Sequence, residues 1–317
     1  MNLRELHNFI IREGIRTDLR SKKQIREYLK SRRREFSKTR RPLKKFFEKE
    51  SLTNPYADTR ILFGDPEKEI RRMMVGIDIE VSEMILADQL RRRGQEVDLV
   101  LAHHPEGIAL AGLDEVMALQ VDMLANLGVD AKIAQSFMQE RIGKVARGLH
   151  GINHTRTVDA ARLLDLPLLC CHTPADNHVV CYLQTVINSA KPRSLDKLVD
   201  LLLKEPEYQD AMRIKAGPKI LVGKGDDRAG KIFVDMTGGS EGTENLYARL
   251  SQLGVKTYLG MHVSDNHFQK LKSEQLNVVI AGHMASDNLG MNLLLDKVEK
   301  NGKFAIIECS GFRRVKR

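Results

Sequence analysis

The chain has 317 residues, of which 42% are hydrophobic, and a formal net charge of +9. No apolar stretch approaches the roughly 20 residues that cross a bilayer, the N-terminus lacks the apolar block of a secretory signal, and the four cysteines have no CxxC spacing. These features exclude a membrane-spanning protein, a disulfide-built secreted domain and a cysteine-ligated zinc site. They predict a cytoplasmic globular protein that is long enough for two α/β lobes.

Residues 1–50 hold the positive charge of the chain. They contain 17 Lys and Arg against 7 Asp and Glu, whereas the rest of the chain contains 34 against 35. Two basic clusters, 31–34 and 40–45, alternate with phenylalanines, a composition suited to the phosphate backbone of nucleic acid. Apolar residues also recur at helical spacing, which favours a helical arm, residues 1–55, that docks on the body or on another subunit. They are Leu3, Leu6, Ile10, Ile11, Ile15, Ile25 and Leu29.

Beyond residue 55 the sequence alternates between strand-like and helix-like segments. The first predicted lobe, residues 56–205, has strands at 73–79, 97–102 and 166–171, with helices at 81–93, 112–127, 130–147, 156–165 and 178–190 and a further helix that Ser194 caps. The second predicted lobe, residues 206–317, has strands at 219–223, 231–236, 255–259, 277–281 and 303–308 and helices at 241–253, 265–274 and 287–300. Open α/β sheets bind ligands at the carboxyl ends of their strands, so a functional site is expected there.

Three predicted strands are followed by histidine, and two of these histidines have a carboxylate four residues later. The side chains of this set are His103, His104, His172, Asp176, His283 and Asp287. Imidazoles and carboxylates are ligands that Zn, Mn and Fe accept. Their position at strand ends therefore predicts a metal site.

Two local spacings in this set suit a pair of ions. His103 and His104 are adjacent and point to opposite sides of an extended chain, which suits two ions flanking the strand end. If His283 opens a helix, Asp287 lies one turn on, close enough to share an ion with it or to bridge two ions. A dinuclear site is therefore favoured.

The motifs that contain these residues resemble those of the NIF-three-like (Ngg-one-interacting-factor-three-like) family, whose bacterial members are often labelled type 2 homologues of GTP cyclohydrolase I. The resemblance covers about residues 70–310. It is carried by Gly76-Ile77-Asp78, Leu101-Ala102-His103-His104-Pro105, His172-Thr173-Pro174-Ala175-Asp176, Met236-Thr237-Gly238-Gly239-Ser240 and Ala281-Gly282-His283-Met284-Ala285-Ser286-Asp287. It implies two interlocked α/β lobes that share a metal site at strand C-terminal ends, in a homo-oligomer such as a hexameric ring.

For the site, the family resemblance implies two divalent ions per chain, of Zn, Mn or Fe. The ligands that map onto this chain are His103, His104, Asp176, His283 and Asp287, with Asp176 or Asp287 as the bridge. The chain departs from the family pattern at Asp287, where the family usually has glutamate, and at Gly260-Met261-His262, where it often has a glycine-glutamate pair. It is therefore expected to be a divergent member.

Two functions stay open from the sequence. In the first, the protein is a metal-dependent hydrolase, phosphoesterase or cyclohydrolase-like, that acts on a nucleotide or another phosphate-containing substrate. His172 and His178 would then be acid-base groups or side chains that orient a ligand. In the second, it is a non-catalytic metal-binding scaffold or regulator that binds protein or nucleic acid through residues 1–50. An open coordination position on the metal would favour the first function.

Overall fold

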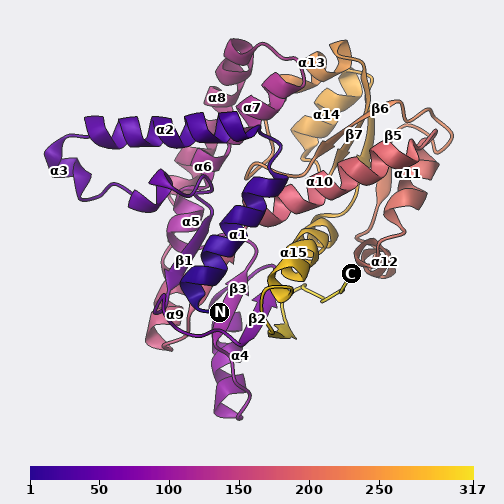
Figure 1. Ribbon diagram of the computed structural model, residues 1–317. Coiled ribbons are helices and arrows are strands. Elements are labelled where there is room, and N and C mark those ends of the chain that lie inside the picture. The colour runs from indigo at the N-terminus through magenta and orange to yellow at the C-terminus, as the bar shows by residue number, and fades with distance from the viewer.

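The computed structural model describes residues 1–317 and contains two sheets with helices packed around them (Figure 1). The first sheet has the spatial order β1 (Thr59–Phe63), β4 (Leu168–Cys171), β3 (Leu99–Ala102), β2 (Arg72–Gly76) and β9 (Ala305–Glu308). The second has the order β5 (Lys219–Val222), β8 (Asn277–Ile280), β7 (Val255–Gly260) and β6 (Lys231–Asp235). In each sheet one edge strand, β1 or β5, is antiparallel to its neighbour and the other strands are parallel. The predicted α/β fold class is confirmed.

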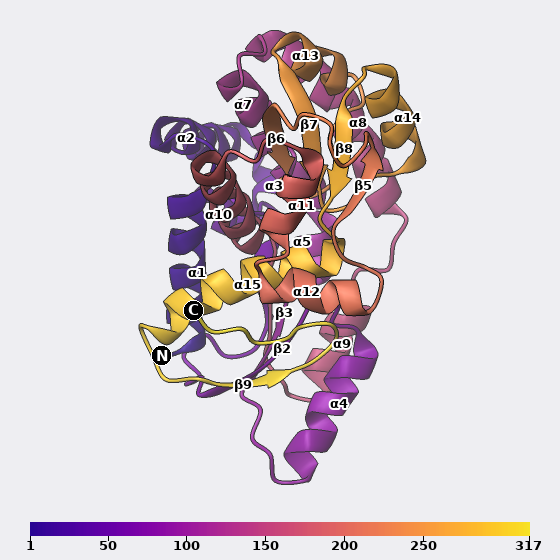
Figure 2. The same cartoon turned by 90° about the vertical axis from the view of Figure 1, so that its right-hand side faces the viewer.

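The two lobes interlock because the chain crosses between them twice. α10 (Thr173–Ala190) leaves the end of β4 in the first sheet and leads to the second lobe, and α15 (His283–Glu299) leads from β8 back to β9. The two helices pack against each other, and Figure 2 shows α15 between the second sheet and the first. The last strand completes the first sheet by pairing with β2, although it belongs by sequence to the predicted second lobe, 206–317.

The remaining helices cover the sheets. Along the chain, the segment from β2 to β4 contains α4 (Val81–Arg92), α5 (Gly107–Ala111), α6 (Leu113–Val116), α7 (Ala118–Asn126), α8 (Ala131–His150) and α9 (Arg156–Leu163). The later ones are α11 (Leu195–Leu202), α12 (Pro206–Arg213), α13 (Leu246–Gln252) and α14 (Asp265–Ser273). α7 and α8 reach across to the second sheet, where Leu124 and Met138 share a core with Phe233 and Tyr258. No helix combines the length and the apolar character that crossing a membrane requires.

The structure differs from the predicted elements at several places. β1, α5 and α12 were not expected, α13 begins five residues later than predicted, and the helix predicted at 112–127 is divided into α6 and α7. α10 begins directly after His172 and not at residue 178. Pro174 explains this early start, because proline is accepted in the first turn of a helix, where a backbone N–H has no partner within the helix.

The predicted N-terminal arm consists of two different parts. Its elements are α1 (Leu3–Thr17), α2 (Lys22–Lys38), α3 (Arg41–Lys44) and the 3-10 turn η1 (Lys49–Leu52). α1 is docked on α10 and α15, with Leu3, Leu6 and Ile10 fully buried. α2 and α3 extend away from the body (Figure 1), and Ile25 is the buried residue of α2. Docking therefore accounts for the apolar face of α1, while most of the basic residues lie on the projecting part.

The first turn of α10 is held between α1 and α15 at two glycines. Gly14 of α1 lies against Pro174, and Gly290 of α15 lies against Ala175. A Cβ atom on Gly290 would stand 2.5 Å from the carbonyl oxygen of Ala175, too close for the two helices to keep their positions. Glycine at these two positions lets the helices approach closely and fixes the start of α10, where Asp176 lies.

Candidate metal centre

The strand-end histidines and the two carboxylates come together where the lobes meet. β3 and β4 are parallel neighbours, so His103, His104 and His172 leave the same edge of the first sheet. Asp176 lies in the first turn of α10, and Asp287 lies near the start of α15. Because these two helices pack against each other, both carboxylates face the histidines.

α15 brings a further histidine into this group through a sharp turn. Its N-cap residue, Gly282, has a φ of 104°, and a Cβ atom there would collide with the carbonyl oxygen of Ala216. Glycine adopts a positive φ without strain and has no Cβ atom, so it is suited to this position. The turn places His283 at the start of the helix and Asp287 one turn on, with 3.5 Å between His283 Nε2 and Asp287 Oδ2.

The two carboxylate oxygens of Asp287 face two different groups of side chains. Oδ1 lies 3.5 Å from Nε2 of His103, which is also 3.5 Å from Oδ1 of Asp176. Oδ2 lies 3.4 Å from Nε2 of His104 and 3.5 Å from Nε2 of His283. These separations exceed the usual hydrogen-bond length of about 2.7–3.2 Å. They match the roughly 3.4 Å expected between two ligand atoms of one tetrahedral ion with bonds of about 2.0–2.1 Å.

Four atoms of this cluster are buried without a hydrogen-bond partner. They are Nε2 of His103, Oδ1 of Asp176 and both carboxylate oxygens of Asp287. A buried polar group left unpaired costs roughly 1–3 kcal/mol, and more when it is charged, so four of them in one cluster need a common partner. A divalent cation meets this need, because the same atom types are ligands of Zn, Mn and Fe. The cluster could therefore hold a metal ion.

Three of the histidines are oriented by protein oxygens that contact their Nδ1 atoms. The partners are the carbonyl oxygen of Cys171 for His103 (3.1 Å), the carboxylate of Asp78 for His104 (2.6 Å) and the carboxylate of Asp58 for His172 (2.9 Å). Donation from Nδ1 fixes the ring and leaves Nε2 available to a metal. The three rings thus present their Nε2 atoms to one small region of the molecule.

Asp58 and Asp78 are not among the predicted site residues. Asp78 follows the end of β2 by two residues, so it lies at a strand end, as the histidines do, and the sequence pattern could have identified it. Asp58 precedes β1, a short antiparallel edge strand that the alternation of strands and helices does not predict. Its carboxylate is buried and also accepts a hydrogen bond from the hydroxyl of Thr173 at 2.6 Å. Only the pairing of β1 with β4 brings it to His172.

Of the two predicted acid-base histidines, the structure brings His172 into the cluster and leaves His178 outside it. Nε2 of His172 lies 3.8 Å from Oδ2 of Asp176, and its ring centroid lies 4.9 Å from that of His103. His178 points toward α1, and its Nδ1 lies 2.7 Å from the carbonyl oxygen of Pro174. The reason is helical geometry, because a residue two positions beyond Asp176 lies about 200° further around the helix.

Burial and neighbouring charges give the members of the cluster different protonation states. Burial alone would raise the pKa of Asp287, but the surrounding imidazoles outweigh it and hold that pKa well below its usual range. Burial, together with the charges of Asp287 and Asp58, raises the pKa of Asp176 to about 7. Burial lowers the pKa of His103 to about 4. Burial also opposes a charge on His172, yet the carboxylates of Asp176 and Asp58 raise its pKa to about 9.

A pocket opens beside the cluster toward the second lobe. Its lining includes His172, Asp176, His283 and Asp287 on one side and Asp235, Tyr258, Glu241 and His262 on the other. His262 belongs to the segment that replaces the family's glycine-glutamate pair, and its ring centroid lies 4.8 Å from that of His283. A larger cavity of about 990 Å³ lies between the end of α10 and β6, but no histidine or carboxylate lines it. The side chains that line the two cavities therefore favour the smaller pocket as the candidate functional site.

Asp235, in the far wall of this pocket, is expected to make stability depend on pH. Its withdrawal from water raises its pKa from 3.8 to about 6, although the hydroxyl of Tyr258 donates to it at 3.0 Å. The folded state therefore keeps this proton to higher pH than the unfolded chain does, and the free energy of unfolding falls as the pH rises from about 4 to 6.

We expect Asp235→Asn, which cannot ionise, to raise the free energy of unfolding at pH 8 by about 1 kcal/mol, because the carboxyl is only partly buried. At pH 4 the variant should match the wild type. Urea unfolding at both pH values measures the difference, and an equal change at both would contradict the assignment.

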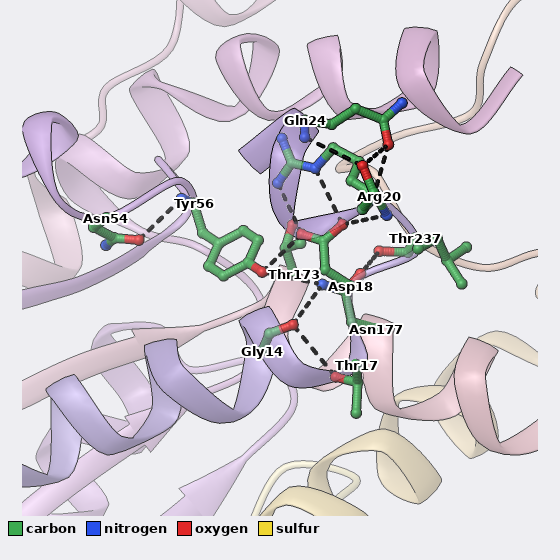
Figure 3. A network of polar contacts seen from close by, with 12 residues as sticks. Gly14, Thr17, Asp18, Arg20, Gln24, Asn54, Tyr56, Thr173, Asn177 and Thr237 are labelled. Carbon is green, nitrogen blue, oxygen red and sulfur yellow. Dashed lines mark hydrogen bonds and ion pairs between the residues drawn. The ribbon is translucent and has the colours of Figure 1, made fainter. Parts of the chain in front are cut away.

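A buried polar network ties the root of the projecting arm to the wall of the pocket (Figure 3). Arg20 pairs with Asp18 at 2.8 Å, and Asp18 also accepts a hydrogen bond from the hydroxyl of Tyr56 at 2.8 Å. Asn177 of α10 donates to that hydroxyl at 3.5 Å and accepts from the hydroxyl of Thr237 at 2.8 Å. Thr237 lines the pocket, so the junction between α1 and α2 is held in one orientation relative to the site.

Comparisons with solved structures agree with this fold. A NIF3 superfamily protein from Sphaerobacter thermophilus matches with a TM-score of 0.69 and 28% sequence identity, over 80% of this chain and 91% of that chain. Reduced HcgD from Methanocaldococcus jannaschii (TM-score 0.49, 16% identity, 78% and 87% of the two chains) is more distant, as is a ybgI protein of unknown function (0.47, 13%, 80% and 90%). No protein-family model and no curated sequence matches the chain.

The two interlocked sheets and the histidine-aspartate cluster define a NIF3-type α/β protein with a candidate metal site. The chain is similar in fold and sequence to a NIF3 superfamily protein, as a divergent relative. The family resemblance seen in the sequence is thereby confirmed. The ligand set and the number of ions remain predictions.

Proposed function

We propose that this protein is a metal-dependent hydrolase that acts on a nucleotide or another phosphate-containing substrate at a centre of two divalent ions. The observation that carries the proposal is the division of the cluster by Asp287. Its Oδ1 groups with His103 and Asp176, and its Oδ2 groups with His104 and His283. This arrangement supports Asp287 as the bridge between two ions of Zn, Mn or Fe, each with fewer protein ligands than a closed structural site.

Different residues of the chain would have different roles in hydrolysis. Bound divalent ions supply a Lewis acid that activates water and neutralises charge on a phosphoryl group. His172 is the candidate for proton transfer, because Asp58 holds its Nδ1 while its Nε2 faces the cluster at the edge of the pocket. Asp78 and the carbonyl oxygen of Cys171 hold the rings of the other two strand-end histidines in place.

The test is a substrate screen on chelator-treated protein that has been reconstituted with Zn²⁺, Mn²⁺ or Fe²⁺. Phosphomonoesters, phosphodiesters and nucleoside triphosphates separate a phosphoesterase from a cyclohydrolase-like enzyme. The proposal expects turnover of at least one class that appears with metal and disappears with chelator. Bound metal without turnover of any class would leave the non-catalytic function in its place.

Replacement of His172 tests its catalytic role separately. We expect His172→Ala to lower kcat by a factor of about 10² to 10⁴, the usual contribution of acid-base catalysis, with the metal content unchanged. His178→Ala, six residues further along the chain, is the control and should keep kcat within a few-fold of wild type, because His178 lies outside the cluster. Loss of metal from His172→Ala would instead make His172 a ligand, since it groups with His103 and His104.

A second candidate function is a metal-binding scaffold or regulator without turnover. The observation that favours it is the projecting basic arm, which hydrolysis at the cluster does not use. In either function we propose a homo-oligomer, such as a hexameric ring, and light scattering on the full chain measures its mass. We also propose a cytoplasmic location, because all four cysteines are unpaired, as is usual in reducing compartments.

A further inference from the structure

The projecting part of the N-terminal region, residues 22–49, is called here the outer arm. It contains α2 and α3 and stands away from both lobes (Figure 1). It has 13 Lys and Arg against 3 Asp and Glu, which accounts for the whole net charge of the chain. The hydrolytic site makes no use of this charge, so the outer arm needs its own explanation.

Most cations of the outer arm have no acidic partner. Arg32 pairs with Glu35 at 2.8 Å and with Glu115 at 3.0 Å, and Lys30 lies 3.9 Å from Glu27. No other cation of the outer arm forms an ion pair. Arg33, Arg34, Lys38, Arg40 and Arg41 among them are exposed. Unneutralised arginines on a rigid helix attract phosphate, which the planar guanidinium binds through two parallel hydrogen bonds.

The distribution of apolar residues separates nucleic acid from a lipid surface. A helix that lies in a membrane needs a continuous apolar face opposite its basic face. In α2 the apolar side chains are Ile25, Tyr28, Leu29 and Phe36, and all of them are buried or half-buried against the rest of the protein. The exposed face of α2 is polar and charged and therefore offers nothing for insertion into a bilayer.

The tip of the outer arm adds an aromatic platform. Phe46 is 74% exposed, and Nζ of Lys45 lies 4.8 Å from its ring centroid. Beside it, the rings of Phe36 and Phe47 pack at 5.0 Å, with Nζ of Lys44 5.0 Å from the ring of Phe36. An exposed aromatic ring among cations is the arrangement on which unpaired nucleic-acid bases stack.

We propose that the outer arm binds single-stranded nucleic acid, with phosphates on the exposed arginines of α2 and a base stacked on Phe46. The proposal goes beyond the hydrolytic function and does not depend on it. The buried pair of Asp18 and Arg20 at the root of α2 holds the outer arm in a fixed direction, which lowers the ordering cost of binding.

The test uses the full chain and a fluorescein-labelled oligo(dT) or oligo(U) of about 20 nucleotides, which exceeds typical single-strand site sizes. Anisotropy titrations between roughly 50 and 200 mM salt should show binding whose logarithm falls linearly with the logarithm of the salt concentration. A duplex of the same length should bind more weakly, because its bases cannot stack on Phe46.

Three variants locate the surface. Arg33→Gln with Arg34→Gln should weaken binding about tenfold or more and reduce the salt slope by about 1.4, since each lost phosphate contact on a single strand accounts for about 0.7. Phe46→Ala should weaken binding about tenfold without changing the salt slope. Arg92→Gln with Arg93→Gln, an exposed adjacent pair at the C-terminal end of α4, is the control and should bind like wild type.

Four results would overturn the proposal. They are absence of oligonucleotide binding at low salt, equal losses in the two arginine double variants, tighter binding to the duplex than to the single strand, and binding to phosphatidylserine vesicles without binding to oligonucleotides. Light scattering of the Arg33→Gln, Arg34→Gln variant adds a further check. A lower oligomeric mass than wild type would show that the outer arm contacts another subunit and would also reject the proposal.

Discussion

Asp287→Ala is expected to abolish the thermal stabilisation that Zn²⁺ or Mn²⁺ gives to chelator-treated protein. Asp287 is the one side chain that faces both ligand groups of the cluster, with its two oxygens 3.4–3.5 Å from three imidazole nitrogens. A ligand that binds only the folded state at a thousand times its Kd adds about 4 kcal/mol of stability. For a chain of this size, that energy corresponds to a rise in Tm of roughly 6 °C in the wild type.

The comparison of each protein with and without metal isolates this effect from any change in intrinsic stability. Asp287→Glu is the matched control, because it restores the carboxylate that the family usually has and should keep most of the shift. A metal-dependent rise in Tm that survives in Asp287→Ala would remove Asp287 from the ligand set and would reject it as the bridge.

Gly290→Ala is expected to destabilise the protein by about 3 kcal/mol, at the upper end of the usual cost of overpacking. The added Cβ atom would meet the carbonyl oxygen of Ala175 at 2.5 Å, where α15 packs against α10. Relief of this contact must move the two helices apart, and they carry Asp176 and Asp287. Metal affinity should therefore fall as well, although Gly290 contacts no ligand atom directly.

Gly148→Ala is the matched control for this prediction. Gly148 lies inside α8, and a Cβ atom there would meet nothing within 4 Å. The same substitution should stabilise the protein by about 0.5–1 kcal/mol, because alanine is the better helix former. Urea unfolding of both variants measures the free energy of unfolding, which should fall in Gly290→Ala and rise in Gly148→Ala. A Gly290→Ala variant as stable as wild type would show that the two helices can separate without cost.

The location of the candidate site could be predicted because its chemistry follows strands. Val100 to Ala102 and Leu168 to Cys171 are fully buried apolar runs, and the histidines come directly after them. Because parallel strands present their carboxyl ends at one edge of a sheet, this pattern predicts that these residues lie together. The sequence does not predict the early start of α10, because proline is common both beyond the end of a helix and in its first turn.

Other features depend on contacts between distant parts of the chain. β9 joins the first sheet by pairing Ile306 with Met73, and no local pattern signals a partner so far away. Asp58 reaches His172 only because β1 pairs with β4 in antiparallel fashion. The position of His178 also depended on the helix boundary, because a helix that starts at Thr173 turns it away from Asp176. Local periodicity carries no information about such tertiary contacts.

The choice between Asp176 and Asp287 as the bridge likewise needed the structure. Both carboxylates follow a histidine by four residues, so their local spacings are the same. The crossing of α10 and α15 puts both oxygens of Asp287 among imidazoles, whereas Oδ1 of Asp176 faces His103 alone within the same distance. The geometry therefore supports Asp287 as the bridge.

The most direct test of the central claim is the metal content per chain, measured by elemental analysis after reconstitution with Zn²⁺, Mn²⁺ or Fe²⁺ and removal of free ions by gel filtration. The protein should be purified without a metal-affinity tag. A dinuclear centre predicts about two ions per chain with the preferred metal. Wild-type protein that retains none of the three metals would contradict the metal centre and the hydrolytic function built on it.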